Sequence, residues 1–324
     1  MKAFVFSKYG MPDVLHLSEV DKPIPNEGEV LVKVHTSAIN DYDWSAVRGK
    51  PIIYRLLFGF FKPKFPIPGM ELSGVVEGLG PNANKFKIGE AVFGDTSESS
   101  FGTFAEFICL KEKALTLKPK SMTHTDAAAM SHAGMLAYQG LVEMGKLKEE
   151  MNILINGAGG GVGTLAFQIA KLYNAKVTAV DTGAKLETLK SLGFDEVLDY
   201  KKVDFTKNGE VYDLILDAKT TRWPWQHLKS LKPKGRYVSI GGFLDRILAL
   251  VLASGIIRLF TKKSLLMVAL KVNKDLEYTN KLYEKGKLKP LIDGPHPFED
   301  FPNQLLRFGE GKHCGKIIVQ VANN

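Results

Sequence analysis

The chain has 324 residues, of which 45% are hydrophobic and 24% charged, and its formal net charge is +8 at pH 7. This is the composition of an ordinary globular protein, and the length fits two domains better than one small core. The chain has only two cysteines, Cys109 and Cys314, and neither belongs to a Cys-x-x-Cys pair, which argues against a disulfide framework and a cysteine-built zinc site. The lysines are spread rather than massed in one run, which argues against nucleic-acid binding.

The beginning of the chain and two apolar stretches bear on where the protein resides. The first residues lack both the apolar core of a secretory signal and the Arg/Ser richness of a transit peptide, so we expect a cytoplasmic location. The segment 51–65 is apolar, but it is short and contains Arg55; the segment 243–260 contains Asp245 and Arg258. We therefore expect no integral membrane segment. We interpret 51–65 as a flap over a pocket or a contact surface, and 243–260 as a buried or interface helix.

The first 120 residues or so consist of short β-like segments separated by Gly, Pro, Asn and Asp. Within each segment Val, Ile and Phe alternate with polar residues, which is typical of half-buried strands. The segments are KAFVFS, VLHLSEV, EVLVKVHTSA, ELSGVVEGLG, EAVFGD and TFAEFICL. This texture predicts a twisted, partly closed β-rich domain.

From about residue 122 the pattern changes to helices that alternate with short apolar runs. Helices are predicted at 125–145 and 161–173, and the apolar runs are MNILING, KVTAVD, YDLILDA, GRYVSIGG and SLLMVALKV. Repeated apolar run and helix is the pattern of a buried parallel sheet with crossover helices. An amphipathic helix in NKDLEYTNKLYEKG and a strand in KIIVQV follow. The sequence thus predicts an α/β protein in which a doubly wound domain is inserted into a β-rich one.

A glycine-rich turn joins the first of these apolar runs to the helix at 161–173. In the sequence INGAGGGVG, the missing β-carbons let backbone N–H groups approach a pyrophosphate, and the helix N-terminus adds partial positive charge. The strand before the turn and the strand KVTAVD after the helix stand at the expected distances, so the motif predicts a dinucleotide site. Its residues are Ala158, Gly159, Gly160, Gly161, Val162 and Gly163, with Ala158 where a first glycine is usual.

Three further residues bear on which dinucleotide binds. Asp181 ends the second strand, 18 residues beyond Gly163, where a carboxylate accepts hydrogen bonds from ribose hydroxyls and repels a 2′-phosphate; alone, it favours NAD. Lys185 follows four residues later, and Tyr200 closes the segment FDEVLDY. A lysine and a tyrosine from neighbouring loops would instead form a clamp for the 2′-phosphate of NADP.

These features together resemble the medium-chain dehydrogenase/reductase superfamily, and within it the zinc-free quinone oxidoreductase group. The matching segments include FPIPGMELSGVVEGLGPN, FKIGEAVFGD, GTFAEF, AGMLAYQGL, INGAGGGVG and SLGFDEVLDY, in family order over nearly the whole chain. The resemblance implies a GroES-like catalytic domain at 1–121 and 271–324 and a Rossmann domain at 122–270. It also implies a cofactor in the cleft between them, and commonly a homodimer.

The resemblance argues against zinc chemistry. Where zinc-dependent relatives carry a cysteine after the third strand, this chain has Asn40, and where they carry Gly-His-Glu it has Gly69-Met70-Glu71. A methionine thioether does not replace imidazole on zinc. In relatives that use NADPH, a lysine and a tyrosine 15 residues apart hold the 2′-phosphate, and Lys185 and Tyr200 match that spacing. We therefore expect NADPH, with NAD as the alternative that Asp181 keeps open, and no zinc.

Without a metal, hydride transfer from the nicotinamide needs an acceptor that is already electron-poor. The expected reaction is reduction of a quinone; the alternatives are reduction of the C=C bond of an enal or enone, and an NADPH-binding sensor or scaffold with little turnover. The sensor reading draws on Leu136, which stands where many relatives carry a threonine, and on the two apolar segments.

The residues expected nearest the chemistry are Asn40 and Tyr42. Asn40 either hydrogen-bonds the substrate carbonyl or the nicotinamide ribose, or it caps the following helix; Tyr42 either donates a proton or lines the pocket. Gly241 and Gly242 fit the loop that lets the nicotinamide approach the backbone, although a plain turn explains them equally well. His132 is expected near the cleft as a hydrogen-bonded structural imidazole.

Overall fold

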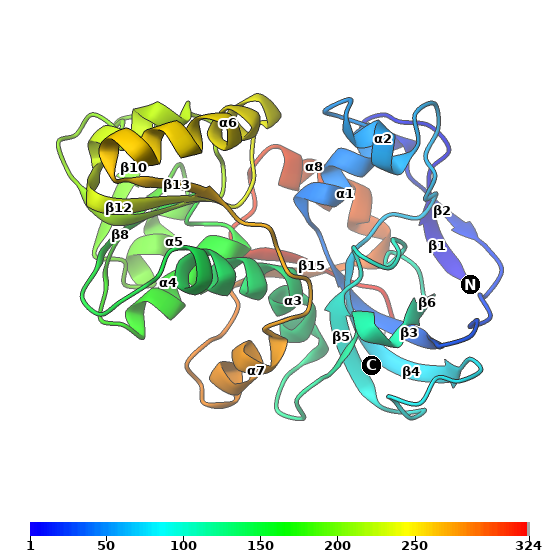
Figure 1. The fold of residues 1–324 in the computed structure, drawn as a ribbon. Helices are drawn as coiled ribbons and strands as arrows, with labels where there is room; N and C mark the ends of the chain where they lie inside the picture. Colours follow the sequence, from blue (N-terminus) through cyan, green and yellow to red (C-terminus); the bar gives the residue numbers. More distant parts are fainter. Residues whose placement is uncertain (323–324) are drawn as a thin grey trace. The chain divides into compact units, whose positions relative to one another are not determined.

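The computed structural model describes residues 1–322, which form two compact units (Figure 1). Unit 1 comprises Met1–His132, Val272–Glu284 and the chain from Pro290 onward; unit 2 comprises Ala133–Lys271 and Lys285–Lys289. The predicted boundaries were 121/122 and 270/271. The first division instead falls within helix α3 (His124–Tyr138), and unit 2 also takes 285–289 from the segment predicted for the other domain.

Unit 1 is built on a seven-strand sheet in the order β14-β15-β3-β4-β5-β7, with β6 also paired to β3, and on a separate β1–β2 hairpin. The pairings are antiparallel except for β14 with β15. The sequence predicted most of these strands from alternation, but not β14, whose IDGPHP sequence contains a glycine and two prolines. The strands are β1 (Lys2–Val5), β2 (His16–Glu19), β3 (Glu29–Ala38), β4 (Glu71–Leu79), β5 (Ala91–Asp95), β6 (Phe107–Lys111), β7 (Thr116–Leu117), β14 (Ile292–Pro297) and β15 (Lys316–Gln320).

The core of unit 1 lies between this sheet and its helices. Val30, Val32 and Val34 alternate along β3 and are fully buried, as the period-two pattern requires. Phe301, from the chain's last helix, stacks on Phe104 with ring centroids 3.6 Å apart. The helices are α1 (Asp41–Arg48), α2 (Tyr54–Phe58), the first part of α3, α7 (Leu276–Glu284) and α8 (Phe301–Gly309), with single turns at Pro12–Val14, Glu112–Ala114 and Phe298–Asp300.

Unit 2 is a six-strand parallel sheet in the order β10-β9-β8-β11-β12-β13. In Figure 1, α6 covers one face of this sheet, and α4 and α5 cover the other. The strands are β8 (Asn152–Asn156), β9 (Lys176–Asp181), β10 (Glu196–Asp199), β11 (Tyr212–Asp217), β12 (Leu231–Ser239) and β13 (Ser264–Met267); the helices are the end of α3, a π-helical turn at Gln139–Met144, α4 (Gly161–Lys171), α5 (Lys185–Ser191), a 3-10 segment at Pro224–Ser230 and α6 (Leu244–Thr261). The predicted doubly wound domain is confirmed. Its strand order reverses between β8 and β11, the position at which such sheets bind ligands.

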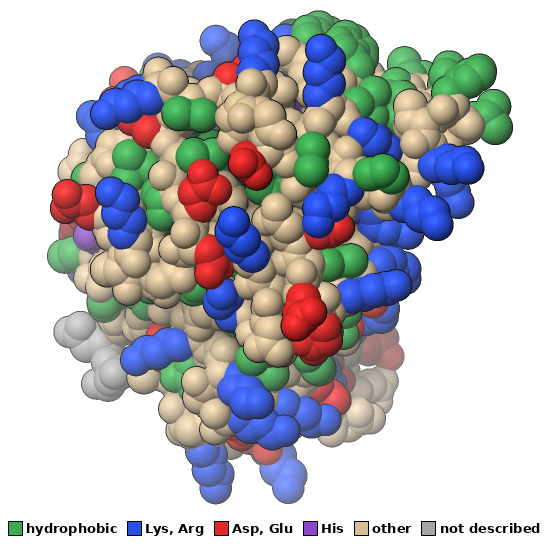
Figure 2. Space-filling view, turned by 90° about the vertical axis from the view of Figure 1, so that its left-hand side faces the viewer, with side chains coloured by type: hydrophobic (Ala, Val, Ile, Leu, Met, Phe, Trp, Pro, Cys, Tyr) green, Lys and Arg blue, Asp and Glu red, His purple; other side chains and the backbone are tan. Residues whose placement is uncertain are grey.

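Helix α6 differs from the buried helix that was one of the two expectations for 243–260. Leu250 is buried, but Leu252 and Phe260 are each 79% exposed, so one apolar side of the helix faces outward. Figure 2 shows hydrophobic side chains gathered at the upper right of the view, with lysine and arginine side chains beside and below them. None of the helices within residues 1–322 is long and apolar enough to cross a membrane.

Candidate functional site

The glycine-rich turn of unit 2 connects β8 to α4. Gly157 has φ +81°, and a β-carbon on Gly163 would lie 2.5 Å from the Cα of Ala158, so this glycine lets α4 pack directly on the turn. A β-carbon on Gly159 would lie 2.7 Å from Lys185 Cδ. Helix α4 begins at Gly161 with Gly160 as its N-cap. The first N–H groups of a helix have no partner inside the helix and carry partial positive charge, so the turn has the geometry of a phosphate cradle.

Asp181, at the end of β9, is tied to this turn. Its side chain is 7% exposed; Oδ2 accepts a hydrogen bond from the Gly159 N–H at 2.8 Å and Oδ1 accepts one from the Thr182 N–H at 3.0 Å. Lys185 Nζ lies 3.6 Å from Asp181 Oδ1, and its side chain is 10% exposed. The two residues that favoured different cofactors therefore form an ion pair, and Lys185 offsets the negative charge of Asp181.

Tyr200 and the glycines after β12 complete the predicted cofactor residues. Tyr200 donates its N–H to the carbonyl oxygen of Asp181 at 3.1 Å, and the residue is 47% exposed. Parallel pairing of β9 and β10 thus places Tyr200 beside Asp181, and the ion pair places Lys185 beside the same aspartate. Gly242 has φ +145°, and a β-carbon there would lie 2.2 Å from the Lys219 carbonyl oxygen, whereas one on Gly241 would meet no atom within 4 Å. The backbone requires glycine at Gly242 and leaves open space at Gly241.

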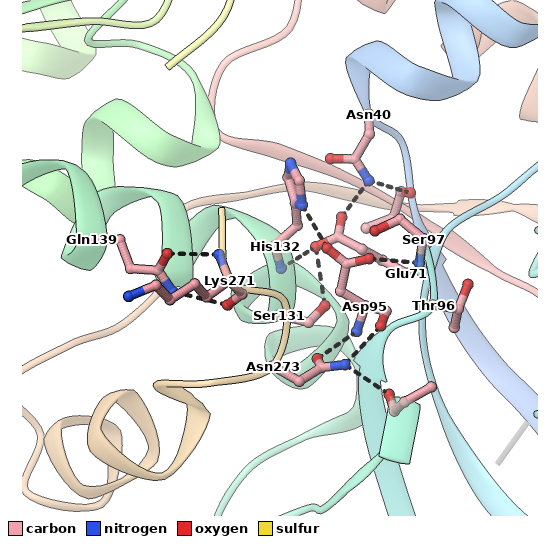
Figure 3. A network of polar contacts seen from close by, with 12 residues as sticks. Asn40, Glu71, Asp95, Thr96, Ser97, Ser131, His132, Gln139, Lys271 and Asn273 are labelled. Carbon is pink, nitrogen blue, oxygen red and sulfur yellow. Dashed lines mark hydrogen bonds and ion pairs between the residues drawn. The ribbon is translucent and has the colours of Figure 1, made fainter. Parts of the chain in front are cut away.

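In unit 1 a buried carboxylate, Glu71, gathers polar groups from several elements (Figure 3). Glu71 begins β4 and is fully buried. Its Oε2 lies 2.6 Å from Lys316 Nζ and accepts a hydrogen bond from Asn40 Nδ2 at 2.5 Å. Its Oε1 accepts hydrogen bonds from Ser131 Oγ at 3.0 Å and from the His132 N–H at 2.5 Å. The ionised carboxylate is thereby compensated by a cation and three hydrogen-bond donors, as a buried charge requires.

Asn40 belongs to this network. Its Nδ2 group donates to Glu71 and to the Ala38 carbonyl, its Oδ1 accepts from Lys316 Nζ, and its backbone N–H donates to Asp43 Oδ2 at 2.8 Å, which fixes the start of α1. Both amide hydrogens and the amide oxygen are engaged within unit 1. Of the two roles left open for Asn40, these contacts favour the structural one over a hydrogen bond to substrate.

Asp43, whose Oδ2 accepts the Asn40 backbone N–H, is 1% exposed. Burial raises the pKa of its carboxyl to about 7, while the hydrogen bond from Asn40 and the charge of Lys316 act in the opposite direction. Asp43 therefore holds its proton far more readily than an exposed aspartate does.

Tyr42, His132 and Asp95 form a second cluster in unit 1. Tyr42, on α1, is 37% exposed and makes edge-on contacts with Tyr54 and with His132, at centroid distances of 6.1 and 6.4 Å. Burial and the nearby carboxylates of Asp95 and Asp41 raise its pKa. A raised pKa makes a phenol a weaker proton donor at neutral pH, so the geometry favours the pocket-wall role for Tyr42.

Met70, the residue that the sequence predicts cannot serve as a zinc ligand, is fully buried and directly precedes Glu71. Within residues 1–322, no group of three or more His, Cys, Asp or Glu side chains is arranged to hold a metal ion.

Comparisons with known proteins identify the family. Residues 26–120 match the alcohol dehydrogenase GroES-like domain, and residues 192–319 match a model described as zinc-binding dehydrogenase. The chain is 32% identical to a chloroplastic quinone-oxidoreductase homolog of Spinacia oleracea, over 99% of this chain and 98% of that protein. The chain belongs to the quinone oxidoreductase-like group of the medium-chain dehydrogenases/reductases. The predicted family and the predicted GroES-like fold are thus confirmed.

Other members of the group extend this result. A chloroplastic NADPH-dependent alkenal/one oxidoreductase of Arabidopsis thaliana is 32% identical over 98% of this chain and 79% of its own length. The structure of the quinone oxidoreductase from Coxiella burnetii superposes with a TM-score of 0.87 at 25% identity, covering 99% of both chains. The chain is therefore an oxidoreductase of this group.

Sequence reasoning did not find Glu71, Lys316 and Asp95 as parts of the site. Met70 stands at the position of a metal ligand in zinc-dependent relatives, and Glu71 is the next residue. This proximity in sequence was the one signal that could have pointed to Glu71. Lys316 lies 276 residues from its partner Asn40, and nothing in a local pattern links the two.

Proposed function

We propose that this chain reduces quinones with NADPH. The observation that carries the choice of cofactor is the Asp181–Lys185 ion pair beside the glycine-rich turn, with Tyr200 at the same sheet edge. The names of its relatives support the reaction class: a quinone oxidoreductase, a quinone-oxidoreductase homolog and an NADPH-dependent oxidoreductase of alkenals and enones.

The charge distribution favours NADPH over NADH. A free carboxylate at the end of the second strand would repel a 2′-phosphate. Here Asp181 is neutralised by Lys185 and already accepts hydrogen bonds from two backbone N–H groups. The Lys185 ammonium and the exposed Tyr200 hydroxyl are then the groups that receive a 2′-phosphate.

The chain's residues contribute binding and orientation rather than covalent chemistry. The turn from Ala158 to Gly163 holds the pyrophosphate, and Gly241 leaves space for the nicotinamide half. Bound NADPH supplies the hydride from C4 of its nicotinamide. The Glu71–Lys316–Asn40 network fixes the start of α1, and through it the position of Tyr42 as a wall of the acceptor site.

The test exchanges Lys185 for methionine and compares the two cofactors. One charge-assisted contact is worth about 1.5–3 kcal/mol, so we expect K185M to raise KM for NADPH roughly 10- to 150-fold and to change KM for NADH little. Lys190→Met is the matched control, because Lys190 is an exposed lysine on the same helix. Equal use of NADH and NADPH by the wild-type protein would refute the clamp.

Reduction of the C=C bond of an enal or enone is the second candidate, because relatives named 2-methylene-furan-3-one reductase and alkenal/one oxidoreductase match over 98% of the chain. A panel of ortho-quinones, para-quinones and short enones decides between the two by kcat/KM. Tight NADPH binding with no turnover of any acceptor would favour the sensor reading. A cytoplasmic location and a homodimer stay predictions. Two of the relatives are named as chloroplastic proteins, which is a statement about those relatives.

A further inference from the structure

A histidine and an aspartate meet in unit 1 in a geometry that the Glu71 network does not explain. His132 Nδ1 lies 2.6 Å from Asp95 Oδ2; the His132 side chain is 12% exposed and that of Asp95 is fully buried (Figure 3). The sequence suggested only a structural imidazole at this position. The Glu71 network engages the His132 backbone N–H, whereas this pair engages the imidazole ring itself.

Asp95 is held rigidly. Its Oδ1 accepts the Ser97 N–H at 2.9 Å, its backbone N–H donates to Asn273 Oδ1 at 3.0 Å, and its carbonyl accepts Asn273 Nδ2 at 2.8 Å. Burial acts to raise the pKa of Asp95, but the hydrogen bonds from His132 and Ser97 and the charge of His132 outweigh it, so the pKa is lowered. Asp95 thus stays ionised and fixes the imidazole with its Nδ1–H toward the carboxylate.

This orientation leaves the other ring nitrogen, Nε2, as the free corner of the ring. In Figure 3 it carries no dashed line, and no hydrogen bond to it occurs among the residues that the structure describes. The half-exposed Tyr42 ring stands edge-on beside the imidazole, with an interplanar angle of 89°. His132 and Tyr42 therefore lie side by side, and burial and nearby carboxylates raise the pKa of Tyr42.

We propose that His132, oriented by Asp95, is the proton donor to the carbonyl oxygen of the acceptor. This inference rests on the proposed function, since it assigns a residue to that reaction. Bound NADPH would supply a hydride, which carries the electron pair of its C4–H bond, to the acceptor. The Nε2–H bond of the imidazolium breaks, an O–H bond forms on the acceptor, and the neutral imidazole regains its proton from water.

The charged groups around His132 fit this role. Asp95 on β5 faces the ring, with its Oδ2 2.6 Å from His132 Nδ1. Glu71 on β4 accepts the His132 backbone N–H, but its charge is compensated by Lys316 on β15. Tyr42 on α1 is a further titratable group in contact with the ring. The Asp95 carboxylate is thus the uncompensated charge that faces the imidazole.

The test measures kcat against pH at saturating NADPH, with 1,2-naphthoquinone as acceptor, for the wild type, H132Q and D95N. A positioned general acid contributes about 10²–10⁴-fold, so we expect kcat of H132Q to fall by at least about 10²-fold with an unchanged Kd for NADPH. The wild-type fall in kcat toward high pH should be absent in H132Q. In D95N that fall should move to lower pH, because loss of the carboxylate disfavours the imidazolium.

Two further variants keep the result interpretable. His16→Gln removes an exposed imidazole from β2 and should leave the pH profile unchanged. If H132Q does not fold, H132N serves instead, judged by its thermal unfolding midpoint. A variant at His132 that keeps the wild-type pH profile, whether or not kcat falls, overturns the donor role. If the wild-type protein binds NADPH but none of the tested acceptors supports NADPH oxidation, the proposed function itself is refuted.

Discussion

Removal of the Lys316 ammonium should strongly destabilise unit 1. In Lys316→Met the fully buried Glu71 loses the cation that lies 2.6 Å from its Oε2. Removing one partner of a buried ion pair costs about 3–5 kcal/mol, because the remaining charge is left uncompensated. A domain of 150–250 residues loses about 2–4 °C in its unfolding midpoint per kcal/mol, so the expected decrease is roughly 6–20 °C.

Scanning calorimetry of the full chain measures this decrease, and two controls give it meaning. Lys22→Met breaks the Lys22–Glu77 pair, whose N···O distance of 2.7 Å is similar but whose side chains are 46% and 36% exposed. An exposed pair of this kind contributes about 0–1 kcal/mol, so its midpoint should change little. The double variant Lys316→Met/Glu71→Gln removes both charges and should recover most of the loss.

Either of two results would show that Lys316 does not stabilise the buried Glu71 carboxylate. One is a decrease for Lys316→Met no larger than that for Lys22→Met, which would show that water or relaxation compensates Glu71. The other is additive losses in the double variant, which would show that the two side chains do not stabilise one another.

Two further predictions concern single sites. The raised pKa of Asp43, about 7 against the usual 3.8, means that the folded state keeps a proton that the unfolded state releases. The contribution of Asp43 to the stability of the fold therefore falls as the pH rises from about 4 to about 7. Over that pH range the unfolding midpoint of Asp43→Asn should rise relative to that of the wild type. A difference in midpoint that stays constant with pH would contradict this. Gly242→Ala should destabilise unit 2, because its β-carbon meets Lys219 O at 2.2 Å, whereas Gly241→Ala, with no atom within 4 Å, should keep the unfolding midpoint and weaken NADPH binding. Unchanged NADPH titration of Gly241→Ala would support a plain turn.

Much of the fold followed from local patterns. Alternation in EVLVKVHTSA predicted β3, and the run KVTAVD coincides with β9. The glycine-rich turn was found because its requirement is local: a strand, missing β-carbons and a helix start within a dozen residues. Strand β14 was missed because its glycine and prolines normally interrupt a strand, and only its pairing with β15 makes it one.

The roles of individual side chains depended on tertiary structure. From the sequence, Asp181 and Lys185 argued for different cofactors, and only their separation of 3.6 Å turned that conflict into an ion pair. Asn40 and Tyr42 were expected at the chemistry, yet the Asn40 amide is bound to Glu71 and Lys316.

The sequence by itself determined that this is a two-domain oxidoreductase of the quinone oxidoreductase-like group with a dinucleotide turn. The tertiary structure decided which polar side chains are paired with one another inside the protein. Asp95 and His132 come from β5 and α3, and Glu71 and Lys316 from β4 and β15. The physical reason is that burial and pairing of charges arise from contacts between distant segments, which no local pattern records.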